Sequence, residues 1–410
     1  MTLLSVSDAR ARILAQFQPL PTESLPLADC LSRILAEDVF AIDDLPSFDN
    51  SSMDGFAVRA ADTAEASSAS PRRLRVVADI PAGSVSTALI AAGEAARIMT
   101  GAHMPVGADA VIPVEDTDFD NRDAGALAPE RIEIFKPAAV GAYIRSRGMD
   151  IHRGEVALRA GHPLTPRALG LLATLGIAVV TIYRKPRVAL FSSGDELLEV
   201  DAPLSPGKIH DSNSYMLAGL IRSAGAETLK LGAAKDNFSS VKATLDEAAR
   251  LQVDLILSSA GVSVGAYDFV KAALESDGSM DFWRVNMRPG KPLAFGTYRG
   301  IPFIGLPGNP VSAFVGFEAF VREALGKLSG LGGTRRQEVR VRCAEEIRSD
   351  GRESYLHASI QEENGVWQAY LTGHQGSGNL SALANANALL IIPAGVKCVP
   401  AGQEINAWLI

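Results

Sequence analysis

The amino-acid sequence predicts a multidomain protein of the α/β plus β class, with a parallel-sheet region placed between β-rich regions. Its 410 residues are enough for two to four domains at about 150 residues each. Strands without polar alternation, separated by amphipathic helices, predict a parallel sheet covered on both faces between residues 188 and 328. Short strands punctuated by Gly, Pro and Asp predict β-domains at residues 50–140 and after the glycine-rich stretch 329–333.

The N-terminal segment, residues 1–48, is predicted to form a helix followed by extended chain. Pro46 keeps Leu45 out of helical geometry near its end. Farther along, Thr165 can cap a helix that Pro166 begins and Gly176 ends, and a β-rich run follows at 177–182. The apolar stretch 168–183, which overlaps this helix and strand, is too short for the ~20 residues of a membrane-spanning helix.

Two successive strand and helix units predict the parallel sheet. The first has a strand at 188–191 and a helix that Asn213 can cap and Gly225 can end. The second has strands at 228–231 and 253–257, a helix between them whose apolar face carries Phe238, Val241 and Leu245, and another helix at 268–274. Four later β-rich runs predict the C-terminal β-domain, at 339–343, 355–360, 367–371 and 389–392.

Charge and cysteine usage narrow the class of partner and compartment. The chain has 39 Lys and Arg against 47 Asp and Glu, a net charge of -8, which disfavours general nucleic-acid binding and a polybasic membrane surface. Cys30, Cys343 and Cys398 lie far apart in the sequence, which excludes a disulfide framework and a zinc knuckle. We therefore expect a cytoplasmic protein with no nucleic-acid or membrane partner.

Polar loops follow the predicted parallel strands, at the sheet edge where ligands bind in open α/β folds. Residues 192–196 end in Asp195 and Glu196, and the glycine and serine loop 258–265 leads to Asp268. Such loops present backbone N–H groups to phosphates or other oxyanions. Glu196 and Asp268 would hold Mg²⁺ against the same phosphates. The alternative for Asp195 and Asp268 is plain helix capping.

Two rigid proline and glycine loops follow, at 287–292 and 305–312. Arg288 and Lys291 bring positive charge, and Ser312 begins the next helix. This combination suits a tetrahedral dianion, and its alternative is a solvated pair of cations on a turn.

Other motifs give weaker indications of function. Residues 261–265 match the G-x-S-x-G nucleophile elbow of α/β-hydrolases, but Ser263 lies past the strand end, and His357 and His374, the only later histidines, fall in the C-terminal β-domain. The chain has neither a G-x-G-x-x-G fingerprint after a strand nor a Walker A motif. Residues 116–127 begin like a calcium loop but place Leu127 at the chelating twelfth position.

Polar loops at 48–58, 97–102 and 141–150, taken singly, are typical of Asx-turns or ion-paired hinges. Taken with the sheet-edge loops and in this order, the sequence resembles the molybdopterin molybdenumtransferase family, whose relatives include the gephyrin E domain. The eight matching segments are 45–58, 97–102, 145–150, 193–197, 261–268, 289–292, 306–312 and 375–390.

The resemblance implies an elongated four-domain homodimer. Its expected parts are an N-terminal mixed domain (1–48 and 141–183), an inserted β-domain (49–140), a molybdopterin-binding-like α/β domain (184–328) and a C-terminal β-barrel (329–410). The implied activity is insertion of molybdate into adenylylated molybdopterin, with Mg²⁺-assisted release of AMP. The implied partners are this pterin, molybdate, a second copy of the chain and a molybdopterin adenylyltransferase.

The resemblance also implies site residues, position by position. The expected catalytic residues are Glu196, Asp236, Asp268, Asp54, Thr100 and Asp150, with Glu196 and Asp268 as metal ligands. The expected substrate- and phosphate-binding residues are Ser193, Gly194, Gly261, Ser263, Gly265, Pro307 and Pro310. The expected molybdate-binding residues are Arg288, Lys291, Pro292, Ser312, Ser377 and His357.

Two positions depart from the family pattern. Ala260 stands where glycine is usual, and His357 stands where arginine is usual. If His357 lines the molybdate pocket, molybdate affinity should weaken as the pH rises from about 6 to 8, because histidine loses its charge there. The alternative is that His357 packs on the barrel and another cation fills the role.

Two other functions remain open at this stage. A molybdopterin adenylyltransferase has a similar α/β domain, although the two extra β regions favour the insertion enzyme. A non-enzymatic scaffold of the gephyrin type could lose Glu196, Asp268 and Lys291 without cost, so their presence favours an enzyme.

Overall fold

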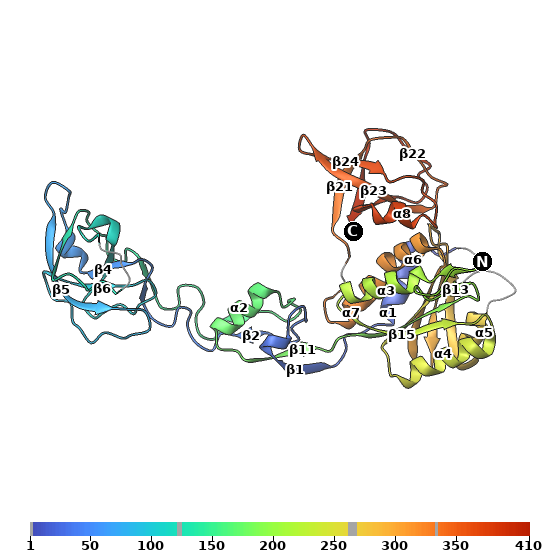
Figure 1. The fold of residues 1–410 in the computed structure, drawn as a ribbon, viewed down its shortest axis with the longest axis horizontal. Helices are drawn as coiled ribbons and strands as arrows, with labels where there is room; N and C mark the ends of the chain where they lie inside the picture. The colour runs from blue at the N-terminus through green and yellow to red at the C-terminus, as the bar shows by residue number, and fades with distance from the viewer. Residues whose placement is uncertain (1–2, 121–124, 261–268, 333–334) are drawn as a thin grey trace. The chain divides into compact units, whose positions relative to one another are not determined.

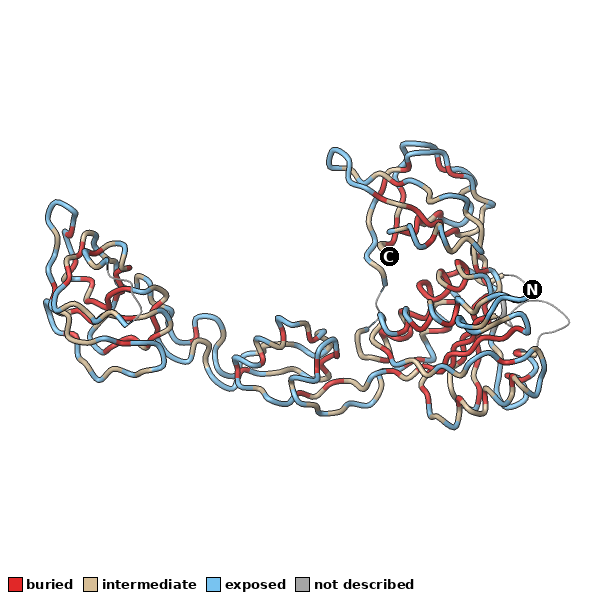
Figure 2. The backbone as a smooth tube through the Cα atoms, viewed as in Figure 1, coloured by how far each residue is buried: buried red, intermediate tan, exposed pale blue. Residues whose placement is uncertain are grey.

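The computed structural model describes residues 3–120, 125–260, 269–332 and 335–410. The chain divides into two compact units, each formed from separate stretches of sequence. Unit 1 comprises residues 1–37, 160–166 and 179–410, and unit 2 comprises residues 38–159 and 167–178. Buried residues concentrate in the sheets and the helices packed on them, as Figure 2 shows.

Unit 2 is built around a five-stranded sheet with strand order β7-β4-β6-β5-β8. Side chains of β4 alternate between two apolar clusters, since Phe56 and Val58 join one and Ala57 joins the other. Strand β4 is therefore buried on both faces, whereas β5 is partly exposed. Its strands are β4 (Gly55–Val58), β5 (Arg72–Ile80), β6 (Glu94–Ile98), β7 (Ala110–Pro113) and β8 (Arg131–Ile134).

Shorter elements complete unit 2. Strand β2 pairs with β10 and β3 pairs with β9, both antiparallel. Helix α2 (Pro166–Thr174) confirms the predicted helix, and Gly176 follows it with a positive φ of 73°. The remaining bounds are β2 (Val39–Phe40), β3 (Asn50–Ser51), η2 (Ala60–Thr63), η3 (Val114–Asp116), β9 (Ile144–Arg145) and β10 (Val156–Leu158).

Unit 1 contains a six-stranded sheet with strand order β15-β12-β16-β20-β19-β17. Strands β12, β15, β16 and β20 run parallel, as predicted, but β19 and β17 are antiparallel to their neighbours. Two antiparallel strands that the sequence analysis did not predict therefore extend the predicted parallel sheet on one side. The cause is the turn at Arg299 and Gly300, both with positive φ, because so short a connection joins only antiparallel strands.

The bounds of these strands are β12 (Arg187–Ser193), β15 (Glu227–Ala234), β16 (Leu255–Ser259), β17 (Gly278–Arg284), β19 (Pro292–Tyr298) and β20 (Ile301–Leu306). Helices cover both faces of the sheet (Figure 1). One face packs on α1 (Val6–Ala15), α3 (Ser212–Ser223), α6 (Pro310–Gly316), the π-helical η4 (Phe317–Val321) and α7 (Arg322–Leu328). The other packs on α4 (Phe238–Arg250) and α5 (Phe269–Asp277).

One strand separates the two cores by simple alternation. Val188 and Leu190 of β12 join the first core, whereas Ala189 and Phe191 join the second. Asn213 does not cap α3, contrary to the prediction, because the Asp211 carboxylate accepts the hydrogen bond from the Ser214 N–H. Short strands complete this part, namely β1 (Thr22–Pro26), β11 (Val179–Tyr183), β13 (Leu197–Leu198) and β14 (Ile209–His210), with η1 (Leu27–Asp29).

The C-terminal region forms a closed β-barrel. Strands follow the order β23-β24-β21-β27-β25, and the pairing of β25 with β23 closes the ring. Strand β18 (Met287–Arg288) adds to β23 in parallel, which joins the barrel to the α/β part. The other bounds are β21 (Glu338–Cys343), β22 (Ile347–Arg348), β23 (Glu353–Glu363), β24 (Val366–Leu371), α8 (Leu380–Ala384), β25 (Ala388–Ile392), β26 (Cys398–Val399) and β27 (Glu404–Leu409).

Within the described residues, no helix is both long enough and apolar enough to cross a membrane.

Candidate functional site

The carboxyl ends of β12 and β15 bring acidic loops together in unit 1. Ser193 of β12 pairs in register with Ala234 of β15, so Asp195 and Asp236 follow neighbouring strands. Their loops are tied reciprocally: the Asp195 N–H donates to the Asp236 carboxylate at 3.4 Å, and the Asp236 N–H donates to the Asp195 carboxylate at 3.3 Å. Two of the predicted acidic residues, Glu196 and Asp236, therefore lie at one edge.

Gly194 allows the Glu196 side chain to fold back over the strand end. Its φ is +152°, and a Cβ built on it would lie 2.6 Å from the Glu196 Oε2. The carboxylate thus lies against the backbone of Gly194. Four other predicted site residues fall outside the described residues, namely Gly261, Ser263, Gly265 and Asp268.

Buried polar atoms line the same edge. Ser192, Ser258 and Asn213 each keep a buried oxygen for which the structure shows no hydrogen-bond partner among the described residues. An unpaired buried polar group costs about 1–3 kcal/mol, which a bound ligand would recover. The amide nitrogen of Asn213 donates to Ser259 Oγ and to the Gly308 carbonyl, both at 2.7 Å.

Our sequence interpretation gave the loops 192–196 and 258–265 a phosphate-binding role through their backbone N–H groups, but it gave none to the side chains of Ser192, Ser258 or Asn213. Two adjacent serines at the end of an otherwise apolar strand were the available signal, at Ser192 and at Ser258. The contact of Asn213 with Gly308 also joins the start of α3 to the loop after β20.

The predicted molybdate residues converge near that loop. Arg288 lies in β18, Lys291 is exposed in the turn that follows, and Ser312 is buried in α6. A Cβ built on Gly290 would lie 3.6 Å from the Ser312 carbonyl oxygen, so the loop of Arg288 and Lys291 borders α6. The Val311 N–H donates to the Ser377 carbonyl at 3.0 Å, which brings the Ser377 loop to the same place.

The two prolines predicted for the phosphate site border it. Pro307 is buried directly after β20, and Pro310 is the first residue of α6. Pro292, predicted for molybdate, begins β19. Because β12, β15, β16 and β20 are parallel, their carboxyl ends share one edge, and the phosphate and molybdate candidates therefore lie along it.

Arg288 has an acidic neighbour. Its Nη1 lies 3.9 Å from the Asp350 carboxylate, which also accepts from Arg352 Nε at 3.0 Å. The hydrogen bond from Arg352, aided by the charge of Arg288, lowers the pKa of Asp350 to about 2. Asp350 is consequently ionised at any working pH.

His357 lies on β23 with 1% of its surface exposed, and its strand neighbours Leu356 and Ala358, not His357 itself, join the core of the barrel. Its Nδ1 lies 2.8 Å from Thr372 Oγ1 and 3.1 Å from Gln375 Nε2. Burial lowers the pKa of this imidazole, so the ring is neutral near pH 7. The sequence analysis expected a histidine that is charged for part of the range between pH 6 and 8, and the lowered pKa reduces that charge.

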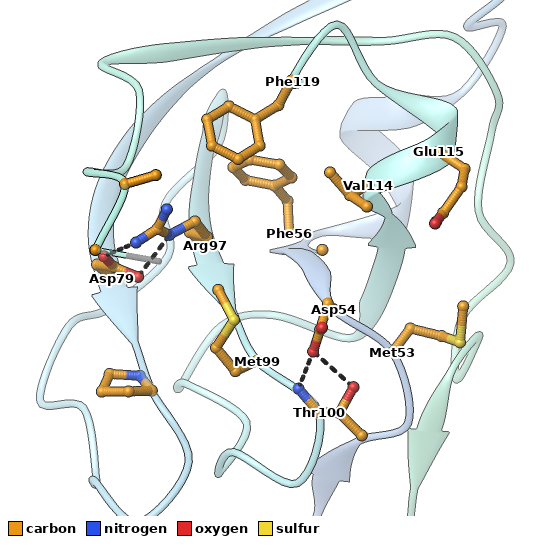
Figure 3. Close-up of a pocket in the computed structure, with 14 residues that line it drawn as sticks. Met53, Asp54, Phe56, Asp79, Arg97, Met99, Thr100, Val114, Glu115 and Phe119 are labelled. Carbon is orange, nitrogen blue, oxygen red and sulfur yellow. Dashed lines mark hydrogen bonds and ion pairs between the residues drawn. The ribbon is translucent and has the colours of Figure 1, made fainter. Parts of the chain in front are cut away.

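Unit 2 contains a cavity of about 750 Å³ that includes two predicted site residues. The Asp54 carboxylate accepts from the Thr100 N–H and hydroxyl, both at 2.7 Å (Figure 3). Phe56, Phe119 and the ion pair of Arg97 with Asp79 form other parts of the wall. Asp150 is not among the lining residues; it is exposed, and its N–H donates to the Leu45 carbonyl.

The described residues contain no group of three or more His, Cys, Asp or Glu side chains arranged to hold a metal ion. Carboxylate oxygens are nevertheless the donors that Mg²⁺ prefers, and one or two suffice when substrate phosphates complete the shell. Glu196 and Asp236 at the sheet edge meet that requirement by donor type.

Comparison with known proteins gives matches along nearly the whole chain. Residues 4–176 match a model described as the MoeA N-terminal region (domain I and II), residues 189–327 a probable molybdopterin binding domain, and residues 340–410 the MoeA C-terminal region (domain IV).

Curated relatives agree with these models. A molybdopterin molybdenumtransferase from a Nostoc strain is 40% identical, covering 94% of this chain and 88% of the relative. One from Bacillus subtilis is 36% identical, covering 100% of this chain and 94% of the relative. The crystal structure of the molybdopterin biosynthesis MoeA protein from Pyrococcus horikoshii matches with a TM-score of 0.82 at 31% identity, covering 100% of both chains.

Proposed function

This chain belongs to the molybdopterin molybdenumtransferase family, and we propose that it inserts molybdate into adenylylated molybdopterin at the shared strand edge of unit 1. The family assignment makes it a transferase of molybdenum cofactor biosynthesis. The observation that carries the location is the convergence of buried serines, acidic loops and a cationic loop along one sheet edge.

The phosphates of the substrate would bind where β12 and β16 end. Ser192 and Ser258 have buried hydroxyls without a partner in the described chain, and Asn213 has such a carbonyl oxygen. The hydroxyls can donate to phosphate oxygens, and loops at strand ends add backbone N–H groups. These groups would hold the adenylylated end of the substrate in place.

Molybdate is a tetrahedral dianion and would be a substrate of the reaction. Arg288 and Lys291 would supply positive charge, and the Ser312 and Ser377 hydroxyls would supply neutral donors. Their convergence at the start of α6 would place molybdate beside the pterin bound at the same edge.

The chain supplies no covalent intermediate in this proposal. The bond that breaks is the phosphoanhydride, attacked by an oxygen of water or molybdate, and AMP leaves. Catalysis is then positional and electrostatic. Glu196 and Asp268, with Asp236 following the strand next to that of Glu196, would hold Mg²⁺, and the cation would supply positive charge against the phosphates.

The unit 2 residues Asp54 and Thr100, together with Asp150, would act in a homodimer by completing a cleft of the other subunit. We also propose a cytoplasmic location and a contact with the adenylyltransferase that would supply the substrate. Light scattering tests the dimer: an active monomer at micromolar concentration would contradict it.

AMP release from the adenylylated pterin tests the reaction. The full-length protein should release AMP only when molybdate and Mg²⁺ are both present. Glu196→Gln should lower the rate about 10²-fold, whereas Glu199→Gln, a change of another exposed glutamate nearby, should leave it within twofold. Equal rates in the two variants would show that Glu196 does not take part in the reaction. Release of AMP without molybdate would contradict insertion.

A further inference from the structure

The loop 373–379, here called the Ser377 loop, connects β24 to α8. Three of its seven residues are glycines, at 373, 376 and 378. The loop has hydrogen bonds within itself, such as that from Asn379 Nδ2 to the His374 carbonyl at 2.8 Å, and two anchors attach it to its surroundings. One anchor is the hydrogen bond from the Val311 N–H to the Ser377 carbonyl at 3.0 Å. This anchor places Ser377 beside the buried Ser312 at the start of α6.

The second anchor is the side chain of Gln375. Its Oε1 accepts from the His357 N–H at 3.0 Å, and its Nε2 donates to the His357 carbonyl at 3.0 Å. The Gln375 amide thus bonds to the backbone of His357 as a neighbouring strand would. The pairing of β23 with β24 begins at the next residue, Ala358. The Ser377 loop is thereby attached to the barrel wall.

The imidazole of His357 lies within hydrogen-bond distance of the Gln375 side chain and also of Thr372. Its Nδ1 lies 2.8 Å from Thr372 Oγ1 and 3.1 Å from Gln375 Nε2. With the ring proton on Nε2, the single lone pair of Nδ1 can accept from the Gln375 amide. Thr372 Oγ1 also donates to the His357 carbonyl at 3.2 Å, and Nε2 is buried without a hydrogen-bond partner among the described residues. A guanidinium has donors only and would face the Gln375 amide donor with a like group.

We propose that His357 is a positioning residue that, with Thr372, orients Gln375 and so fixes the Ser377 loop against α6, setting the affinity for molybdate without touching it. This role rests on the proposed function, because it assumes that Ser312 and Ser377 bind the oxyanion. The almost complete burial of the ring agrees with action through Gln375. The lowered pKa of His357 keeps the acceptor available at neutral pH.

Amide substitutions separate this role from simple packing. Asn places an oxygen near the position of Nδ1, whereas Gln places its amide near the position of Nε2. His357→Asn should therefore keep the KM for molybdate within about twofold of the parent value. His357→Gln and His357→Arg should raise it at least fivefold, with kcat changed less than twofold, because the chemical step does not involve the ring.

Gln375→Ala tests the same link from a half-buried loop residue whose loss does not threaten the core. It should raise the KM for molybdate as much as His357→Gln does, while Gln361→Ala, a change of an exposed glutamine on β23, should have no effect. Hydrogen exchange of the peptide spanning the Ser377 loop should quicken in Gln375→Ala, His357→Gln and His357→Arg, and should stay unchanged in Gln361→Ala and His357→Asn.

Calorimetric titration with molybdate alone keeps this proposal separable from the proposed function. A parent protein that neither binds molybdate nor turns over would overturn the proposed function itself. If the parent binds but Gln375→Ala binds equally well, or if Asn and Gln at position 357 behave alike, the positioning role is wrong. Melting temperatures of all variants, measured in parallel, identify any effect that comes from unfolding.

Discussion

Replacing Ala260 by glycine should raise the free energy of unfolding. Ala260 follows β16 with φ of +71°, a left-handed conformation that costs a residue with a Cβ about 1–2 kcal/mol. Glycine removes that cost, but its greater conformational entropy stabilises the unfolded chain by about 0.4–1 kcal/mol. The net stabilisation should be about 0.5–1 kcal/mol. Our sequence interpretation marked this alanine as a departure, and its φ explains why glycine suits the position.

Gly308 provides the matched partner for this change. A Cβ built on Gly308 would lie 3.2 Å from the Ala260 Cβ, which is closer than ordinary contact. Gly308→Ala should therefore destabilise the parent by about 1–3 kcal/mol through overpacking. In the Ala260→Gly background the opposing Cβ is gone, so the cost of Gly308→Ala should fall by at least about 0.5 kcal/mol.

Native-state hydrogen exchange at the β16 amides is the suitable measurement, because a chain of two units need not unfold in one step. The four proteins of the cycle should be compared at one pH and temperature. Equal costs of Gly308→Ala in both backgrounds would show that the two Cβ atoms do not meet. A loss of stability in Ala260→Gly would refute the strain at that residue.

Three further changes follow from charges and burial. Asp350→Asn should tighten molybdate binding about threefold at low salt, because it removes a negative charge 3.9 Å from Arg288; calorimetry should show the gain fading in salt. Burial alone would raise the pKa of Glu318, but its two arginine hydrogen bonds outweigh burial and lower it. Glu318→Gln should therefore cost about 3–5 kcal/mol, measured by native-state hydrogen exchange of the helical amides around it, since it leaves buried guanidinium charge without its partner. Because the pKa of His357 is lowered in the folded protein, the unfolded chain binds a proton near pH 6.5 while the folded ring is still neutral. Stability should be complete above about pH 6.5 and fall as the pH drops below it, and urea titrations of His357→Gln should show a flatter profile.

Local chemistry made much of the fold predictable. The apolar run beginning at Val188 predicted β12, and Thr165, Pro166 and Gly176 predicted the bounds of α2 to within two residues. These signals succeed because burial on both faces and helix termination depend on the residues present in one short segment. The same reasoning put the polar loops at the carboxyl ends of parallel strands.

Partners distant in the sequence were decided only by the tertiary structure. The antiparallel β17 and β19 and the closing of the barrel by β23 and β25 depend on which strands become neighbours. The positive φ of Ala260 and the neutral, buried His357 depend on surroundings assembled from other segments. Composition and spacing therefore determined the class, the order of elements and the types of loop. Pairing, backbone strain and protonation were settled by packing, because each is an energy shared between residues far apart along the chain.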